Sequence, residues 1–219
     1  MLTKELFDHL TEKQKIELIE ESKLLVFPKN TVLFAEGSKS AGPFFIEYGT
    51  VKRYISGVDG KESIFEILGP GDIFGHRILF THENHFDSSC SITEVRLKFI
   101  PKDLFTRFIV ENNEFNKEYI NLLSTDGIRH IRHSQVVAQL SLRQRTAFYL
   151  LYIQSKNLNP ENRDVEISRE DLANLLGTVK ESAVRILHEF KAENALTSSG
   201  RKMTITDMEH MKKVAKIFK

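Results

Sequence analysis

The chain has little cysteine and no long hydrophobic run, and both absences limit what it can be. One cysteine among 219 residues, Cys90, excludes an intrachain disulfide framework and an iron–sulfur cluster held by cysteines of one chain. No apolar run reaches about 18 residues, so we expect no transmembrane helix. The first residues lack a basic stretch followed by an apolar core, which argues against secretion. We therefore expect a cytoplasmic protein of a prokaryotic-type cell.

Charge is nearly balanced overall, at +1, but is unevenly distributed. Residues 140–219 carry 14 Lys and Arg against 10 Asp and Glu, whereas residues 1–139 carry 17 against 20. A basic C-terminal part is typical of proteins that gain affinity for DNA by neutralising phosphates. The length fits two domains, each able to bury a core.

Residues 167–187, ISREDLANLLGTVKESAVRIL, carry the most informative pattern. The pattern predicts two short helices joined by a tight turn at Gly177. Ser168 can cap the first helix, with Asp171 at capping-box spacing. Both helices have a predicted apolar inner face, made by Leu172, Ala173, Leu175, Leu176, Ala183, Val184, Ile186 and Leu187.

The predicted second helix leaves Lys180, Glu181 and Arg185 on its outer face, near its start. A recognition helix presents side chains to the major groove from this position. Lysine and arginine can donate to guanine, and glutamate can accept from cytosine. The alternative is an ordinary helical hairpin with a solvated charged face.

Residues 195–205 predict two short strands around a Ser-Ser-Gly-Arg-Lys turn. Residues 165–167 can pair with them as a third strand. This pattern fits the wing of a winged helix, with Lys202 at a basic tip near the DNA backbone. Residues 207–219 predict a closing helix with an apolar side made by Met208, Met211, Val214, Ala215 and Phe218.

The N-terminal half predicts a small β-roll or barrel after a helical opening over residues 3–21. Asp59 and Gly60 give a strong hairpin signal. The predicted strands cover residues 24–27, 31–35, 43–48, 50–56, 61–68, 87–91 and 94–100.

A long helix is predicted from about Glu114 to Gln139, and a second one from Ser141 to about Lys156. The long helix carries an interrupted apolar stripe of Ile120, Leu123, Ile128, Ile131, Val136, Val137 and Ala138. The interruptions are Gly127, His130 and His133. This stripe favours a dimerisation helix; the alternative is a helix packed only on the roll.

A turn-rich roll, a long helix and a winged helix-turn-helix together resemble the Crp/Fnr family of transcription regulators. The specific motifs are GPGDIFG at residues 69–75, DGKE at 59–62 and LGTVKESAVRIL at 176–187. The resemblance implies an α+β chain: a cupin-like antiparallel β-roll sensor domain (1–112), a dimerisation helix (113–139) and a winged helix-turn-helix DNA-binding domain (140–219).

The resemblance also implies a homodimer that binds near-palindromic double-stranded DNA and contacts RNA polymerase. In this family, Glu181 and Arg185 would read bases, and Lys180 would add a base or phosphate contact. Backbone phosphates would be contacted by Ser168, Arg169, Thr178, Ser182 and Lys202.

The effector site departs from the family's cyclic-nucleotide cassette. The cassette's glutamate, arginine and serine correspond here to His76, Phe86 and Asp87. A phenyl ring cannot donate hydrogen bonds to a phosphate, and a carboxylate repels it, so we do not expect cyclic AMP to bind in the usual manner. The remaining candidate residues of an effector site are Gly75, Arg77 and His130. The residues leave two alternatives open: an unknown small effector, anionic or apolar and seated near Phe80, Phe86 and Arg77, or a regulator without any effector.

Three other functions each account for only part of the sequence. Histidine and cysteine side chains can bind metal ions or haem iron, and several lie in this part of the chain. Their spacing matches no tight ligand motif; they are His76, His82, His85, Cys90, His130 and His133. A nucleotide-binding regulatory module explains the roll and leaves the winged helix unexplained. We do not expect an enzyme, because strands 24–68 contain no histidine for a cupin metal site, and no nucleophile elbow or phosphate loop occurs.

Overall fold

The computed structural model describes residues 6–57, 59–81, 83–159 and 161–216. By its internal contacts the chain divides into two compact units, residues 1–55 with 68–130 and residues 56–67 with 131–219. Three features expected from the sequence lie outside the described residues: positions 3–5 of the opening helix, His82 of the histidine group and Phe218 of the closing helix.

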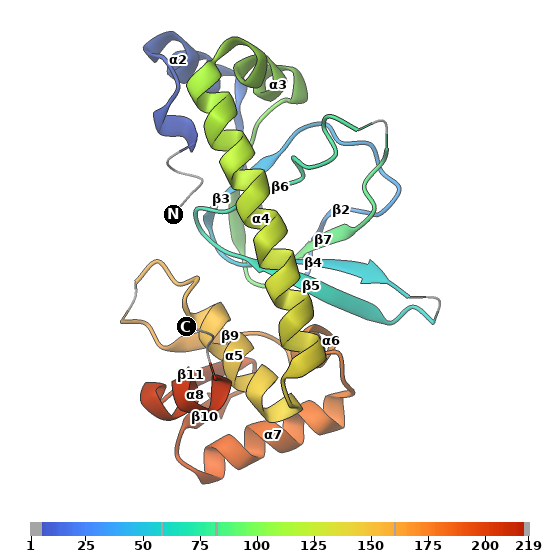
Figure 1. The fold of residues 1–219 in the computed structure, drawn as a ribbon, viewed down its shortest axis with the longest axis vertical. Coiled ribbons are helices and arrows are strands. Elements are labelled where there is room, and N and C mark those ends of the chain that lie inside the picture. The colour runs from blue at the N-terminus through green and yellow to red at the C-terminus, as the bar shows by residue number, and fades with distance from the viewer. Residues whose placement is uncertain (1–5, 58, 82, 160, 217–219) are drawn as a thin grey trace. The chain divides into compact units, whose positions relative to one another are not determined.

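The roll consists of two four-stranded antiparallel sheets (Figure 1). The first has the order β1-β8-β3-β6 and the second β2-β7-β4-β5. The strands are β1 (Lys23–Phe27), β2 (Val32–Phe34), β3 (Phe44–Tyr48), β4 (Val51–Ser56), β5 (Glu62–Leu68), β6 (Ile73–Phe74), β7 (Ser88–Ser91) and β8 (Val95–Phe99). Every strand predicted from the sequence is present. The two-residue strand β6 was not predicted, because it is too short to show a periodic pattern.

Side chains from both sheets form a buried core inside the roll. Its members are Ile46, Val51, Leu68, Phe74, Val95 and Leu97, with Phe27, Leu33, Phe34 and Phe44 packed against them. Because side chains alternate along a strand, Arg53 on β4 shares the face of Val51 and is buried too. A charged group therefore lies among the interior side chains of the roll.

The helices α2 (Glu12–Glu21), α3 (Lys102–Glu111) and α4 (Asn113–Gln139) accompany the roll. The expected continuous opening helix is wrong, because the chain breaks before Thr11, whose side chain caps α2 in a full capping box. Helix α3 was not predicted, although Leu104, Phe105, Phe108 and Ile109 make its buried side. These helices share a second core of Leu6, Leu10, Leu18, Ile73, Leu79, Ile100, Leu104, Phe105, Phe108, Ile109, Phe115, Tyr119 and Leu122.

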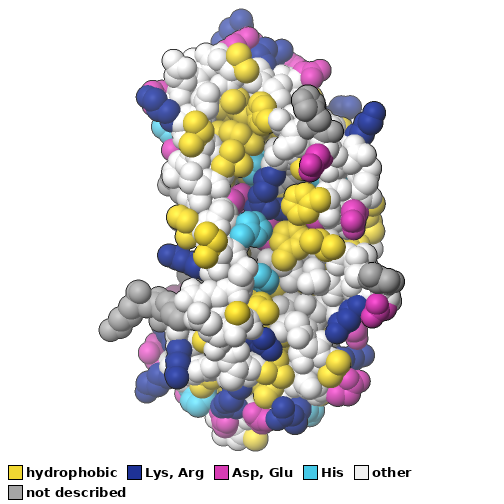
Figure 2. Space-filling model, turned by 45° about the vertical axis from the view of Figure 1, so that its right-hand side comes forward, with side chains coloured by type: hydrophobic (Ala, Val, Ile, Leu, Met, Phe, Trp, Pro, Cys, Tyr) yellow, Lys and Arg dark blue, Asp and Glu magenta, His cyan; other side chains and the backbone are white. Residues whose placement is uncertain are grey.

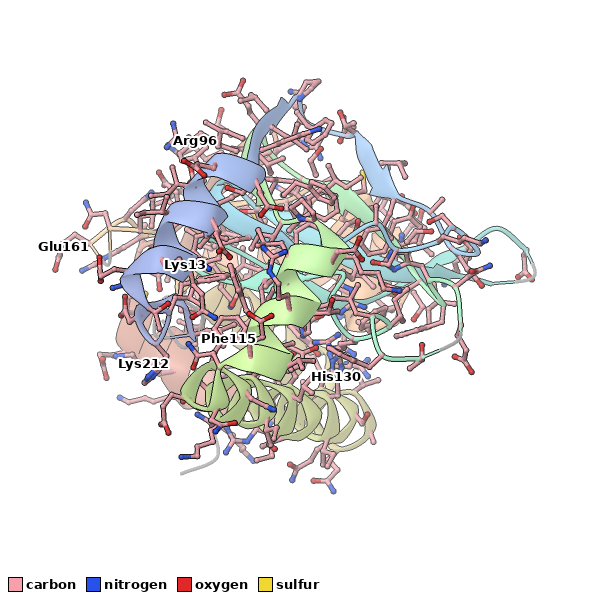
Figure 3. The ribbon with its side chains drawn as sticks, turned by 90° about the horizontal axis from the view of Figure 1, so that it is seen from above. Lys13, Arg96, Phe115, His130, Glu161 and Lys212 are labelled. Carbon is pink, nitrogen blue, oxygen red and sulfur yellow. The ribbon has the colours of Figure 1, made fainter. Side chains whose placement is uncertain are left out.

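Helix α4 therefore has two different faces within the roll unit. Phe115, Tyr119, Leu122 and Asp126 are buried, and His130 is partly buried. Figure 3, which looks along the helix, shows Phe115 and His130 toward the strands rather than on its outer side. The predicted stripe residues Ile120, Leu123, Ile128 and Ile131 are instead exposed. Packing on the roll thus does not bury the stripe, whose Val136 alone is fully buried.

The second unit contains the winged helix-turn-helix. Its elements are α5 (Leu142–Gln154), β9 (Asp164–Glu166), α6 (Arg169–Leu176), α7 (Lys180–Ala192), β10 (Leu196–Ser199), β11 (Lys202–Ile205) and α8 (Met208–Ala215). The three strands form one antiparallel sheet in the order β10-β11-β9, as the sequence predicted. The mixed α+β fold class is confirmed.

Candidate nucleic-acid interface and effector site

The first helix of the hairpin, α6, begins at a side-chain cap. The Ser168 hydroxyl oxygen accepts a hydrogen bond from the backbone N–H of Asp171 at 2.9 Å, as predicted. The same hydroxyl donates to the Asp171 carboxylate at 2.6 Å. The hydroxyl of Ser168 is therefore occupied within the protein.

The turn between α6 and α7 depends on Gly177. Its φ of 64° is left-handed, a conformation that glycine adopts without steric cost. The next residue, Thr178, donates its backbone N–H to the carbonyl of Ala173 at 3.0 Å. The turn thus bonds the carbonyls of Ala173 and Asn174 and redirects the chain into α7.

Helix α7 presents the three predicted base-reading residues. Lys180, Glu181 and Arg185 are all exposed, and the Arg185 side chain is 66% exposed. Lys180 lies 3.8 Å from Glu170, a loose ion pair. The inner face of the helix is held by Ala183, Ile186, Leu187 and the unpredicted Phe190, which are buried.

The predicted phosphate contacts differ in how much their side chains are already engaged. Thr178 and Ser182 are partly buried beside the turn. The Lys202 ammonium lies 2.7 Å from the Asp164 carboxylate. Arg169, by contrast, has no ion-pair partner among the residues that the structure describes, and burial lowers the pKa of its guanidinium. A partly desolvated cation without a counter-ion is suited to an external phosphate.

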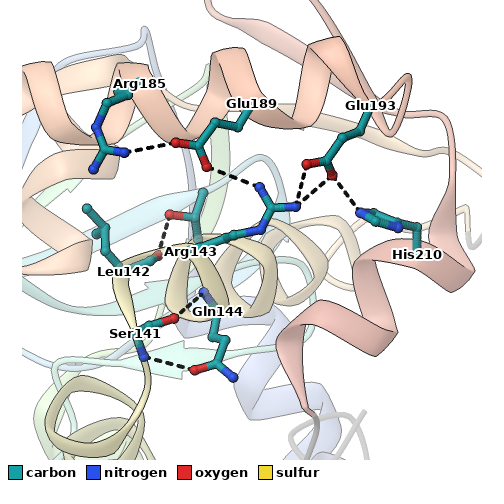
Figure 4. A network of polar contacts seen from close by, with 9 residues as sticks. Ser141, Leu142, Arg143, Gln144, Arg185, Glu189, Glu193 and His210 are labelled. Atoms are coloured by element: carbon teal, nitrogen blue, oxygen red, sulfur yellow. Dashed lines mark hydrogen bonds and ion pairs between the residues drawn. The ribbon is translucent and has the colours of Figure 1, made fainter.

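Arg185 also belongs to a chain of ion pairs that was not predicted from the sequence (Figure 4). Its Nη1 donates to Oε1 of Glu189 at 2.8 Å, and Oε2 of Glu189 accepts from Nη1 of Arg143 at 3.2 Å. Nη2 of Arg143 donates to both oxygens of Glu193, which lies 2.8 Å from Nε2 of His210. Glu189 follows Arg185 by four residues, a helical pair spacing that is visible in the sequence.

In the roll, Asp87 forms an internal ion pair. Its Oδ2 accepts a hydrogen bond of 2.8 Å from Nε of Arg53, and both side chains are buried. The guanidinium carbon of Arg53 lies 6.0 Å from the centre of the Phe86 ring. Phe86 and Asp87, which replace the cassette's arginine and serine, therefore gather around a cation supplied by β4.

His76 and Arg77 meet a second carboxylate, that of Asp126 on α4. The side chain of Arg77 donates to Asp126 at 2.9 Å, and Nε2 of His76 lies 3.5 Å from the same oxygen. Arg129 adds a contact of 3.2 Å to the other oxygen. Burial lowers the pKa of the fully buried His76 imidazole, against the opposing effect of Asp126. Arg77 is thus engaged with a carboxylate of α4.

The remaining candidates of the effector site contribute less. Gly75 adopts a φ of 78° in the turn after β6, and His130 is partly buried on α4. His85 stacks on Phe34, with ring centres 3.8 Å apart. Among the described residues, which exclude His82, no three His, Cys, Asp or Glu side chains are grouped to hold a metal ion. Nor does any helix in the described part combine the length and hydropathy needed to span a bilayer.

Comparison with known families gives one match for each half of the chain. The model described as "Cyclic nucleotide-binding domain" matches residues 24–112, and that described as "Crp-like helix-turn-helix domain" matches residues 144–214. The chain belongs to the Crp/Fnr family of transcription regulators. Members of this family are DNA-binding regulators rather than enzymes.

Individual Crp/Fnr relatives are distant in sequence but similar over most of the chain. A CRP-like cAMP-activated global transcriptional regulator of Mycobacterium tuberculosis is 25% identical over 194 residues, covering 87% of each chain. A cyclic AMP receptor protein of Thermus thermophilus is 23% identical and covers 78% of each chain.

Solved structures agree in fold. A putative regulator of the crp/fnr family from Eubacterium rectale superposes with a TM-score of 0.77 at 20% identity, over 96% of this chain and 97% of the other. FixK2 from Bradyrhizobium japonicum gives a TM-score of 0.79 at 16% identity, over 88% and 96%. The Crp/Fnr architecture is thus shared at low sequence identity.

Proposed function

We propose that this Crp/Fnr regulator is a cytoplasmic homodimer that binds near-palindromic double-stranded DNA, contacts RNA polymerase and does not respond to cyclic AMP. In this proposal, residues 1–112 are the sensor domain, 113–139 the dimerisation helix and 140–219 the DNA-binding domain. The observation that carries it is the exposed Arg185 near the start of α7, behind the glycine turn of the helix-turn-helix.

Base and phosphate contacts divide between two groups of residues. Arg185, Glu181 and Lys180 read base edges, because their side chains leave the outer face of the recognition helix. Arg169 supplies a phosphate contact, and its lack of an internal ion pair among the described residues supports this role. Ser168, Thr178, Ser182 and Lys202 lie on the hairpin and wing and complete the contacts to the backbone.

Dimerisation is supported by the outer face of α4. Ile120, Leu123 and Ile128 are exposed on one side of the helix, and Ile131 continues the row at 71% exposure. Figure 2 shows hydrophobic side chains gathered in patches on one face of the molecule. Apolar residues repeating along an exposed helix are typical of a seam that a second copy covers. A two-fold dimer would place its recognition helices about 34 Å apart, one turn of DNA.

The effector proposal rests on the charge inside the roll. Some relatives are named as cAMP-activated regulators. In this chain the buried Arg53 already has a carboxylate, Asp87, at 2.8 Å. An entering cyclic phosphate would meet that carboxylate where the cassette has a serine, and repulsion opposes its binding. The roll would therefore respond to another small effector or to none.

The decisive experiment selects DNA sites from a random library with the wild type and with Arg185→Ala. Replacing Arg185 should cost about 1–3 kcal/mol at the selected site and relax one base pair in each half-site. Lys191→Ala removes a positive charge from the far end of the same helix and should leave base preference unchanged. An equal loss on all sequences would make Arg185 a phosphate contact.

For the sensor, calorimetry should detect no cyclic AMP binding; micromolar affinity altered by substituting Asp87 would contradict the proposal.

A further inference from the structure

Glu189 shares its two carboxylate oxygens between two arginines. Oε1 accepts from Arg185 at 2.8 Å and Oε2 accepts from Arg143 at 3.2 Å (Figure 4). We propose that Glu189, held by Arg143, positions the Arg185 guanidinium and thereby sets how strongly the protein discriminates at one base pair. The inference rests on base reading by Arg185 and names the residues that control it.

The sharing of the Glu189 carboxylate between two arginines matters because guanine recognition needs two neighbouring N–H donors of the Arg185 guanidinium to be free. Arginine reads guanine by donating two parallel hydrogen bonds to O6 and N7. A carboxylate that bound Arg185 with both oxygens would occupy that same pair of donors. Since Arg143 takes Oε2, Glu189 engages Arg185 through Nη1 alone among the described contacts. Nη2 and Nε therefore remain available to a base while the side chain is held.

Arg143 is itself fixed, which makes it an effective anchor. Its Nη2 donates to both oxygens of Glu193, at 2.8 and 2.6 Å. Its guanidinium carbon lies 4.4 Å from the centre of the Phe190 ring, and Phe190 is fully buried. An exposed i,i+4 ion pair such as Arg185–Glu189 is weak when it is isolated. Here the Arg185–Glu189 pair lies at one end of a network of ion pairs that is anchored on the core between α5 and α7. The pair therefore fixes the orientation of the Arg185 side chain and adds little to folding stability.

The charge of Glu189 adds to discrimination. Without the carboxylate, the Arg185 guanidinium can turn toward any nearby phosphate, a contact that carries no sequence information. Holding Arg185 by Glu189 disfavours that alternative, because leaving the pair costs the arginine its counter-ion. Glu189 is thus a positioning residue, and its removal should reduce specificity rather than total affinity for DNA.

The test compares Glu189→Gln, Arg143→Met and Arg185→Ala with the wild type, using the operator selected for the wild type. Dissociation constants are measured at one salt concentration for that operator, for its single-base variants and for non-specific DNA. In Glu189→Gln, discrimination should fall about fivefold at the base pair read by Arg185 and stay unchanged elsewhere. Affinity for non-specific DNA should stay equal or rise. Arg143→Met should give the same loss of discrimination at the same base pair. Without Arg143, both carboxylate oxygens of Glu189 can accept hydrogen bonds from Arg185 and occupy the donors that a base needs.

Glu209→Gln on α8 removes one negative charge from the same domain without touching Arg185, and should change nothing. In the Arg185→Ala background, Glu189→Gln should have no further effect on discrimination. A loss spread over all base pairs, or an equal loss without Arg185, overturns the inference. If Arg143→Met does not fold, as judged by thermal unfolding, the cycle of Glu189→Gln with Arg185→Ala decides alone. If Arg185→Ala leaves every base preference intact, the proposal that Arg185 reads a base is wrong. If Arg185→Ala relaxes the preference at one base pair and Glu189→Gln does not, only the positioning role of Glu189 is wrong.

Discussion

The carboxylate of Asp87 and the guanidinium of Arg53 form an ion pair inside the roll, 2.8 Å apart, with side chains 0% and 3% exposed. The two residues are 34 positions apart in the chain. Burying a charge is costly unless an opposite charge and hydrogen bonds accompany it. The pair therefore supplies from within the protein the neutralisation that a bound anion would otherwise give to Arg53.

Replacing Asp87 by asparagine should destabilise the protein by about 3–5 kcal/mol, because the buried Arg53 loses its carboxylate. The free energy of unfolding is measured by urea titration followed by circular dichroism. The double variant Arg53→Met, Asp87→Leu removes both charges and should recover most of the loss. Asp103→Asn, at an exposed position of α3, serves as the control and should cost little. A cost below about 1 kcal/mol for Asp87→Asn would mean that water or other groups already solvate Arg53.

His76 should make stability depend on pH. Burial lowers the pKa of its imidazole in the folded state below the ordinary 6.5, while Asp126 partly opposes and Arg77 and Arg53 reinforce the shift. Below about pH 6.5 the unfolded chain binds a proton that the folded protein takes up only at lower pH, so stability falls on acidification. Stability should be fully present above pH 6.5, and the urea midpoint should drop between pH 7.5 and pH 5.5.

His76→Gln should reduce this dependence on pH. It should not abolish the dependence, because burial also lowers the pKa of His85. His188→Gln, at an exposed position of α7, is the matched control for the substitution itself. An unchanged slope in His76→Gln would show that His76 is protonated equally well in the folded and unfolded states.

The helix-turn-helix could be predicted because its signals are local. Ser168, Gly177 and the leucines of α6 lie within a few residues of one another, and each acts on the backbone next to it. The strands of the roll were visible for the same reason, since turn residues separate them. The spacing of its apolar residues could have predicted helix α3, which was missed. Strand β6 is too short to show an alternating pattern.

The side-chain contacts of the two sites could not be predicted in the same way. Arg53 meets Asp87 only because β4 pairs with β7, in a register that places Arg53 opposite Ser89. Asp126 meets Arg77 only because α4 packs on the turn after β6. Such contacts depend on long-range packing, which no local pattern encodes. The i,i+4 spacing of Arg185 and Glu189 was visible, but the role of Arg143 in dividing Glu189 required the structure.

The exposed stripe of α4 should be needed for dimerisation. Ile128 is 53% exposed, and Ile128→Glu would place a charge in an apolar seam. Analytical ultracentrifugation should show a shift from dimer to monomer. Affinity for the full operator should then fall at least about tenfold, because two linked half-sites no longer bind together. Ile19→Glu makes the same change at an exposed position of α2 and should leave the dimer intact. A dimeric Ile128→Glu would place the interface elsewhere.

Arg169 should act through charge alone, independently of sequence. Arg169→Ala should weaken binding equally on all DNA sequences and lower the slope of log affinity against log salt by about 0.9, the value for one phosphate contact. Lys202→Ala should lower the slope less, because the Lys202 ammonium is already paired with Asp164 at 2.7 Å. Folding stability separates this role from a structural one. Arg169 has no ion-pair partner among the described residues, and burial disfavours its charge, so Arg169→Ala should not lower the unfolding temperature. A destabilised variant with an unchanged salt slope would instead make Arg169 a support of α6 and leave its phosphate to another side chain.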